Sequence, residues 1–194
     1  MNNKNTKHLI ALGYPMGILP TDDEAHYKID FRDEVYGIGG LEYIVWQLAF
    51  AMENTEEAKR KFIQLTRKSE DTFFEVGEKL MKNKFIIEVN LMNLHNEINK
   101  LYDFSFVRQG VGRGLFVDKN RKEKYTVINL NKEIELSFIE YLLWTRGNGS
   151  TKIYKMIKEI MDNYKEESDR EDILETICRA LLILYKNNLI VFKG

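Results

Sequence analysis

One short motif occurs twice in this chain, 98 residues apart. Residues 41–46 read LEYIVW and residues 139–144 read IEYLLW, so the two copies differ only by exchanges between aliphatic residues. The match continues downstream, where residues 81–87 (MKNKFII) resemble residues 185–191 (YKNNLIV). A repeat of this kind indicates two copies of one supersecondary unit. The chain is therefore expected to fold as two similar units.

Length and composition agree with two small globular units. The chain has 194 residues, of which 44% are hydrophobic and 30% are charged, as in typical globular proteins. A unit of about 85 residues buries only about 60–65% of its unfolded surface. We therefore expect the units to pack on each other or on a second chain, and a homodimer is one alternative. The net charge of −1 gives no sign of a polyanionic partner.

The sequence lacks the features of a secreted or membrane protein. Residues 9–20 (LIALGYPMGILP) are interrupted by glycine and proline, and no run of about 18 apolar residues occurs. The single cysteine, Cys178, lies in an apolar run and is expected to be a buried small hydrophobe. We expect a soluble, cytoplasmic protein with no membrane partner. Its high lysine and asparagine content is typical of bacterial or phage proteins from AT-rich genomes.

Hydrophobic periodicity predicts the elements of the first unit, residues 1–89. Strands are expected at residues 8–18, 26–31, 35–38 and 85–87. Helices are expected at residues 40–52, 56–67 and 70–83. Thr55 is the expected cap of the second helix, and Ser69 is the expected cap of the third.

The second unit, residues 108–194, has the same predicted order. Strands are expected at 125–130, 134–136 and 189–192, and helices at 138–146, 152–164 and 169–187. Ser137 is expected to cap the first of these helices, and Ser168 to open a capping box for the last. Residues 90–107 are expected to connect the units through a helix capped by Asn90. Its apolar stripe either packs on the units or pairs with a second chain, and the stripe comprises Leu91, Leu94, Ile98 and Leu101.

Three helices with a small antiparallel sheet are typical of the winged-helix class. We therefore expect an α+β fold of two tandem winged-helix-like units. The second unit resembles the winged-helix peptide chaperone of pyrroloquinoline quinone biosynthesis and the related leader-peptide recognition domains. The resemblance rests on Ile134-Glu135-Leu136-Ser137 running into an apolar helix that ends near Gly147, and on a final helix leading to Asn187-Asn188-Leu189-Ile190. It covers about residues 112–192, and more faintly 14–88.

The resemblance implies a peptide-binding function. In that family a partner peptide adds as a strand beside the third strand and lies against the third helix. In the first unit the matching strand, residues 36–38, contains Gly37 and is followed by two glycines, which weakens its case as a docking edge. The implied peptide contacts in the second unit are Ile134, Glu135, Leu136, Ile173, Ile177 and Ala180.

The alternative function is DNA binding by a transcriptional regulator. Residues 108–124 carry six lysines or arginines against two acidic residues, and glycines there let backbone N–H groups approach an anion. The simpler alternative is a solvated, charged turn. Major-groove insertion of the third helix is disfavoured, because residues 70–75 and 169–175 are rich in Asp and Glu. The candidate phosphate contacts are Arg113, Lys119, Arg121, Lys122 and Lys124.

No residue pattern points to an enzyme, a metal site or a cofactor. The three histidines are scattered, with no pair at the spacing of metal ligands. The glycines at positions 110, 112 and 114 precede a strand, whereas a dinucleotide fingerprint needs a helix and a different spacing. We therefore expect a protein that acts by binding.

Three further patterns carry structural predictions. The helical spacing of Tyr43 and Trp46, repeated at Tyr141 and Trp144, favours core or interdomain packing over an aromatic binding surface. The repeated glutamate at positions 42 and 140 indicates a solvent face or, alternatively, a polar contact to the hairpin. In the final helix a second apolar line needs its own cover, from the other unit, a second subunit or a peptide. This line consists of Cys178, Leu182 and Tyr185.

Overall fold

The computed structural model describes residues 7–20, 25–52, 54–90, 94–117, 123–162 and 167–194. The chain forms two units, the first comprising Met1–Glu97 with Phe192–Gly194 and the second comprising Ile98–Val191. Both combine helices with small antiparallel sheets. The expected α+β class with tandem units is therefore confirmed. Within the described ranges, no helix has the length and the apolar character that crossing a membrane requires.

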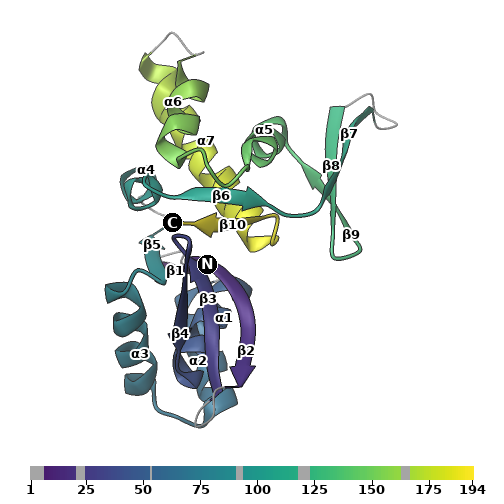
Figure 1. Ribbon diagram of the computed structural model, residues 1–194. Coiled ribbons are helices and arrows are strands. Elements are labelled where there is room, and N and C mark those ends of the chain that lie inside the picture. Colours follow the sequence, from purple (N-terminus) through teal and green to yellow (C-terminus); the bar gives the residue numbers. More distant parts are fainter. Residues whose placement is uncertain (1–6, 21–24, 53, 91–93, 118–122, 163–166) are drawn as a thin grey trace. The chain divides into compact units, whose positions relative to one another are not determined.

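The first unit consists of a three-stranded meander, three helices and a separate strand pair (Figure 1). The meander strands, in spatial order, are β2 (Tyr14–Pro20), β3 (Ala25–Phe31) and β4 (Glu34–Ile38). The helices are α1 (Gly40–Ala51), α2 (Thr55–Thr66) and α3 (Glu70–Lys82). Strand β1 (Lys7–Ala11) pairs antiparallel with β5 (Ile86–Asn90), and the short helix α4 (Leu94–Glu97) follows.

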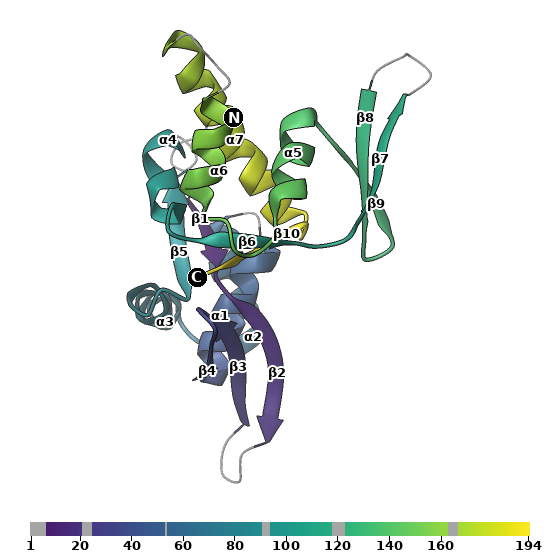
Figure 2. The ribbon, with the colours of Figure 1, turned by 45° about the horizontal axis from the view of Figure 1, so that its top comes forward.

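The second unit repeats this order after a 3₁₀ helix at Ile98–Leu101. Its meander, in spatial order, is β7 (Val111–Val117), β8 (Glu123–Asn129) and β9 (Lys132–Leu136). The helices are α5 (Phe138–Arg146), α6 (Ile153–Met161) and α7 (Glu167–Lys186). Strand β6 (Ser105–Arg108) pairs with β10 (Ile190–Lys193). Figure 2 shows α5 between the meander and α7.

The predicted helices and meanders form close to their expected bounds, but the first strand and the connection differ. Residues 8–18 form two strands, because the chain turns at Gly13, where φ is +91°. A Cβ there would lie 2.6 Å from the carbonyl oxygen of Asp30, so only glycine fits this approach. Asn90, the expected cap of a connecting helix, is the last residue of β5, and the first described helix after it begins at Leu94. Residues 98–107, expected in the connection, group with the second unit.

The helix caps are partly as predicted. Ser69 and Ser137 cap α3 and α5, since their hydroxyl oxygens accept from the N–H groups of Thr72 and Glu140. The cap of α2 is Asn54 rather than Thr55, because Asn54 Oδ1 accepts from the N–H of Glu57 at 2.9 Å. The last helix begins earlier than expected, at Glu167, so Ser168 lies within α7.

A stack of three aromatic rings recurs in both units. In the first unit Tyr27 of β3 stacks on Tyr43 of α1 with centroids 4.1 Å apart, and Tyr43 stacks on Trp46 at 5.9 Å. The second unit has the same stack at 4.6 Å and 5.8 Å, formed by Tyr125, Tyr141 and Trp144. Both tryptophans are buried. The repeated motif therefore packs the first helix of each unit against its meander.

The repeated glutamate is a helix-capping residue. Glu42 Oε2 accepts from the backbone N–H of Gly39 at 2.7 Å, and Glu140 Oε2 accepts from that of Ser137 at 2.7 Å. Each carboxylate thus satisfies the N–H group just before its helix. The solvent-face interpretation missed this local role.

Candidate functional site

Strand β9 forms one edge of the second meander. It pairs with β8 in a register that places Asn129 opposite Lys132 across the two-residue turn Leu130-Asn131. In such a hairpin the residues flanking the turn exchange hydrogen bonds, and the bonded pairs then alternate along the strands. The backbone groups of Glu133 and Glu135 therefore point away from β8. No other described strand pairs with β9.

The side chains of β9 alternate between the interior and solvent. Leu136 is buried, with 5% of its surface exposed, and Ile134 is half-buried. Glu133 and Glu135 are exposed on the opposite side. The edge thus offers outward-facing backbone groups next to an apolar side chain, which is the arrangement that strand addition uses.

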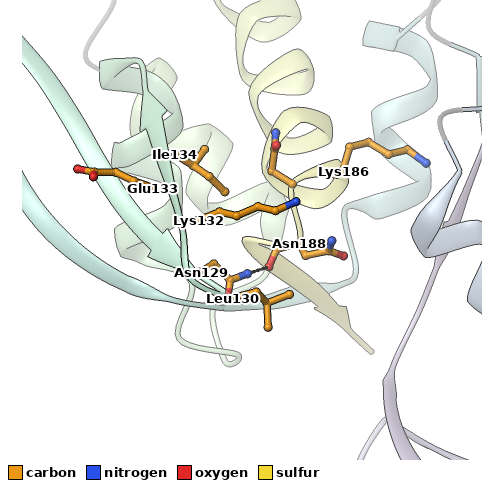
Figure 3. A pocket seen from close by; sticks show the side chains of 8 residues that line it. Asn129, Leu130, Lys132, Glu133, Ile134, Lys186 and Asn188 are labelled. Carbon is orange, nitrogen blue, oxygen red and sulfur yellow. Dashed lines mark hydrogen bonds between the residues drawn. The ribbon is translucent and has the colours of Figure 1, made fainter.

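A hollow of about 460 Å³ lies between the start of β9 and the C-terminal turn of α7. In Figure 3 the Lys132 side chain extends from β9 toward the end of α7, and Ile134 points into the same space, while Glu133 points away. Asn129 Nδ2 donates to the carbonyl oxygen of Asn188 at 2.6 Å and ties the hairpin to the helix end. The lining residues are Asn129, Leu130, Lys132, Glu133, Ile134, Lys186, Asn187 and Asn188.

The first unit has hollows in the equivalent place, along β4 and α3. One of about 360 Å³ adjoins the hairpin turn and the end of α3. Another, of about 670 Å³, lies further along, between Gly37 of β4 and Lys79 of α3. Gly37 lines both, so they follow one strand edge. At the second hollow, Lys79 forms an ion pair with Glu42.

Ile183 is a site residue that the sequence reasoning missed. The downstream repeat aligns Lys79 with Ile183, so α7 carries an apolar side chain where α3 carries an ion-paired lysine. Ile183 is 43% exposed. Its place on α7, one turn before Asn187, puts it on the helix face that reaches the hollow. The aligned repeat was the signal that could have identified it.

The predicted α7 contacts lie elsewhere. Ile177 is fully buried and Ala180 is 3% exposed, while Ile173 is half-buried. Ile177 and Ala180 belong to the core of the helix rather than to an open surface. Of the predicted peptide contacts, the structure places Ile134 at the hollow, next to Glu135 and Leu136 on the same strand.

Two of the candidate phosphate contacts in the basic hairpin, residues 108–124, lie beside the acids of β9. Lys124 Nζ lies 2.7 Å from Glu135 Oε2, and Arg113 lies 3.6 Å from Glu133 Oε1. Lys119, Arg121 and Lys122 lie outside the described residues. The two predicted contact sets therefore meet on one sheet, where ion pairs partly neutralise the cations.

Cys178 is unsuited to nucleophilic chemistry. Burial raises the pKa of its thiol to about 12, and the nearby charge of Glu175 adds to the effect, so the thiolate is scarce at neutral pH. Leu182 and Tyr185 are buried with it, so the second apolar line of α7 is covered within this chain. Among the described residues, no group of three or more His, Cys, Asp or Glu side chains is placed to hold a metal ion.

Comparisons of the chain with models of protein families, with curated proteins and with solved structures found no significant match. The candidate site is therefore defined by the geometry of the second unit and by the internal repeat. Its parts are the open edge of β9, the hollow beside it, and the exposed face of α7 that carries Ile183.

Proposed function

We propose that this chain is a non-enzymatic binding protein of tandem winged-helix type that recognises a protein or peptide partner. The partner segment adds as a strand beside β9 and contacts the exposed face of α7. The observation that carries the proposal is the outward-facing backbone of Glu133 and Glu135 next to the hollow that β9 shares with α7. Backbone hydrogen bonds supply affinity in strand addition, and flanking pockets supply specificity.

Apolar anchors support this proposal. Ile134 is half-buried at the hollow, and Ile183 is exposed on α7. Covering such side chains with a peptide contributes about 25 cal/mol per Å² of apolar surface removed from water. The resemblance to leader-peptide recognition domains predicts the same mode of binding.

DNA binding is the second candidate, carried by the basic hairpin. The described residues favour it less, because Arg113 and Lys124 are engaged by Glu133 and Glu135. The start of α3 is acidic at Glu70 and Asp71, and carboxylates there would face phosphates.

A peptide selection tests the proposal. A phage-displayed library of random peptides is panned against the full chain, and the Kd of enriched peptides is measured for the wild type, Glu135→Pro and Glu135→Gln. Proline removes an outward N–H and is tolerated on an edge strand, so we expect about a tenfold loss of affinity, corresponding to one hydrogen bond. Glu135→Gln keeps the N–H and should bind like the wild type.

Salt dependence separates the two candidates. Peptide binding by strand addition should change little between about 50 and 200 mM salt, whereas several phosphate contacts lose at least tenfold over this range. If Glu135→Pro binds the enriched peptides as well as Glu135→Gln does, the proposed edge is wrong. Salt-sensitive binding of a random-sequence duplex with no peptide enrichment would favour DNA.

A further inference from the structure

We infer that the hollow at the start of β9 selects an acidic side chain of the bound segment, with Lys132 as the specificity-determining residue. This inference rests on the proposed function and names the chemistry of its partner. The occupant is an extended peptide whose Asp or Glu lies beside the turn Leu130-Asn131. Its apolar residues lie further along β9, near Ile134.

The charge of the hollow favours an anion. Two of its lining residues, Lys132 and Lys186, are cations, and the one acidic lining residue, Glu133, points away from both in Figure 3. Glu133 lies 3.6 Å from Arg113 and is thereby partly neutralised. A carboxylate held at this place would have the Lys132 ammonium as its donor, whereas the Lys186 side chain is directed away from β9 in Figure 3.

Lys132 has no structural task within the described residues that explains its position. No described carboxylate forms an ion pair with it. Three of the last four carbonyls of α7 do not need it either, because local backbone groups already satisfy them. Ile183 O accepts from the N–H of Asn187, and the N–H groups of Leu189 and Asn188 donate to the carbonyls of Leu184 and Tyr185.

The corresponding hollow of the first unit is also lined by positively charged residues, but they occupy different positions of the repeat. Its hollow at the hairpin turn is lined by Arg32 and Lys84, together with aromatic side chains and no acidic residue. In the aligned repeat these cations correspond to Leu130 and Asn188, while Lys132 corresponds to Glu34. Each hollow is thus lined by positively charged residues, but at different positions of the repeat. This is expected if a positive charge at the hollow is needed for binding, whichever residue supplies it.

A peptide is a better occupant of the hollow and of the β9 edge than a nucleic acid. The strand that leads away from the hollow carries Glu133 and Glu135 on its exposed side, and these carboxylates would repel successive phosphates. In a peptide with one acidic residue, that residue meets Lys132, and the rest of the β9 edge pairs with the peptide backbone.

The test is a peptide selection with charge reversal. The random-peptide library is panned against the wild type, Lys132→Glu and Lys158→Glu, where Lys158 is an exposed lysine of α6 outside the hollow. We expect Asp or Glu to be enriched about two- to fivefold at one position on the wild type and on Lys158→Glu. Lys132→Glu should prefer Lys or Arg at that position.

Affinities complete the test. Replacing the selected acid by alanine should weaken binding about two- to fivefold on the wild type and leave it unchanged on Lys132→Met. The neutral methionine variant keeps the test valid if Lys132→Glu misfolds. Equal peptide preferences for Lys132→Glu and Lys158→Glu, or no preference for acids, would overturn the inference.

The outcomes distinguish this inference from the proposed function. Peptides that bind Glu135→Gln but not Glu135→Pro, without any preference for an acid, would leave strand addition standing and remove the acid-selecting hollow. Peptides indifferent to both Glu135→Pro and Lys132→Glu would overturn both. Salt-sensitive binding of duplex DNA that weakens in Lys132→Glu, without peptide enrichment, would also overturn both.

Discussion

The indole Nε1 of Trp144 donates a 2.9 Å hydrogen bond to the backbone carbonyl of Gln109. The first unit makes the same connection, from Trp46 Nε1 to the carbonyl of Leu12 at 3.0 Å. In both units the acceptor follows the first strand and precedes a glycine with positive φ. The repeated tryptophan thus fixes the first helix of each unit to the point where the chain turns into the meander.

Replacing Trp144 by phenylalanine should lower the free energy of unfolding by about 1–3 kcal/mol. The substitution removes the hydrogen bond to Gln109 and leaves a small void beside a buried ring. Urea unfolding followed by circular dichroism measures the change. Tyr154→Phe, at an exposed position of α6, is the control and should change stability by less than about 0.5 kcal/mol. Equal effects of the two variants would contradict the anchoring role of Trp144.

Gly110→Ala should destabilise the protein more than Gly114→Ala. Both glycines have positive φ, at +87° and +83°, so alanine costs about 1–2 kcal/mol at either position. At Gly110 the new Cβ would also lie 2.5 Å from the carbonyl oxygen of Ile128, whereas nothing lies within 4 Å at Gly114. Thermal unfolding of the two variants gives the order. A Tm for Gly114→Ala as low as that for Gly110→Ala would show that the close approach is unimportant.

The ion pair between Glu42 and Lys79 should make stability depend on pH. Burial raises the pKa of Glu42, but the hydrogen bonds from Lys79 and from the Gly39 N–H, with the charge of Lys79, lower it more, so the net pKa lies below its ordinary value of 4.5. A depressed carboxyl pKa stabilises the folded state above the unfolded pKa, and this contribution is lost as pH falls through the folded value.

Glu42→Gln should therefore be less stable than the wild type at pH 7 by about 0.2–1 kcal/mol, because Lys79 is largely exposed. The difference should shrink as the pH falls below 4.5. Urea unfolding at pH 7 and pH 3 measures it. In a Lys79→Met background the loss of stability caused by Glu42→Gln at pH 7 should be smaller. An unchanged loss would show that only the hydrogen bond between Glu42 and the Gly39 N–H contributes.

Cys178 should destabilise the folded state at high pH. Its pKa is raised from 9.0 to about 12, so above pH 9 the unfolded chain releases the thiol proton more readily than the folded chain. The stability conferred by the neutral thiol is complete below pH 9 and is lost as the pH rises toward the folded value. The stability difference between the wild type and Cys178→Ala should be constant from pH 7 to 8.5 and shift against the wild type by pH 10.5. A constant difference throughout would show an accessible thiol.

Local signals in the sequence predicted most of the helices. Ser69, Ser137 and the apolar spacing of residues 40–52 are short-range features, and α3, α5 and α1 begin and end within about two residues of expectation. The split of residues 8–18 was not predictable in this way. Strand β1 pairs with β5, so Leu9 lies opposite Glu88, and a pairing between segments so far apart leaves no local pattern.

The candidate site was predicted in part. Ile134 and Ile177 both followed from the resemblance to leader-peptide recognition domains, but only Ile134 lines the hollow, because Ile177 is buried in the core. The exposed Ile183 was not among the predicted contacts. The outward backbone positions also depend on the turn. Ile134 has its N–H directed at β8, so proline there would disrupt the meander, whereas proline at Glu135 tests the free edge.

Leu130→Asn should stabilise the second unit by about 0.5–1 kcal/mol. Leu130 occupies the first turn position with φ at +48°, in the left-handed region that leucine adopts at a cost and asparagine tolerates. Its side chain is 78% exposed, so little burial is lost. Val111→Asn, at a similarly exposed position of β7 without positive φ, makes a comparable apolar-to-amide change and should give no gain. Urea unfolding measures the change in stability of both variants. Equal changes would show that relief of backbone strain in the turn is not the cause of the gain. If Leu130→Asn is more stable and its peptide affinity is unchanged, the Leu130 side chain does not contact the partner, and the turn acts only by setting the start of β9.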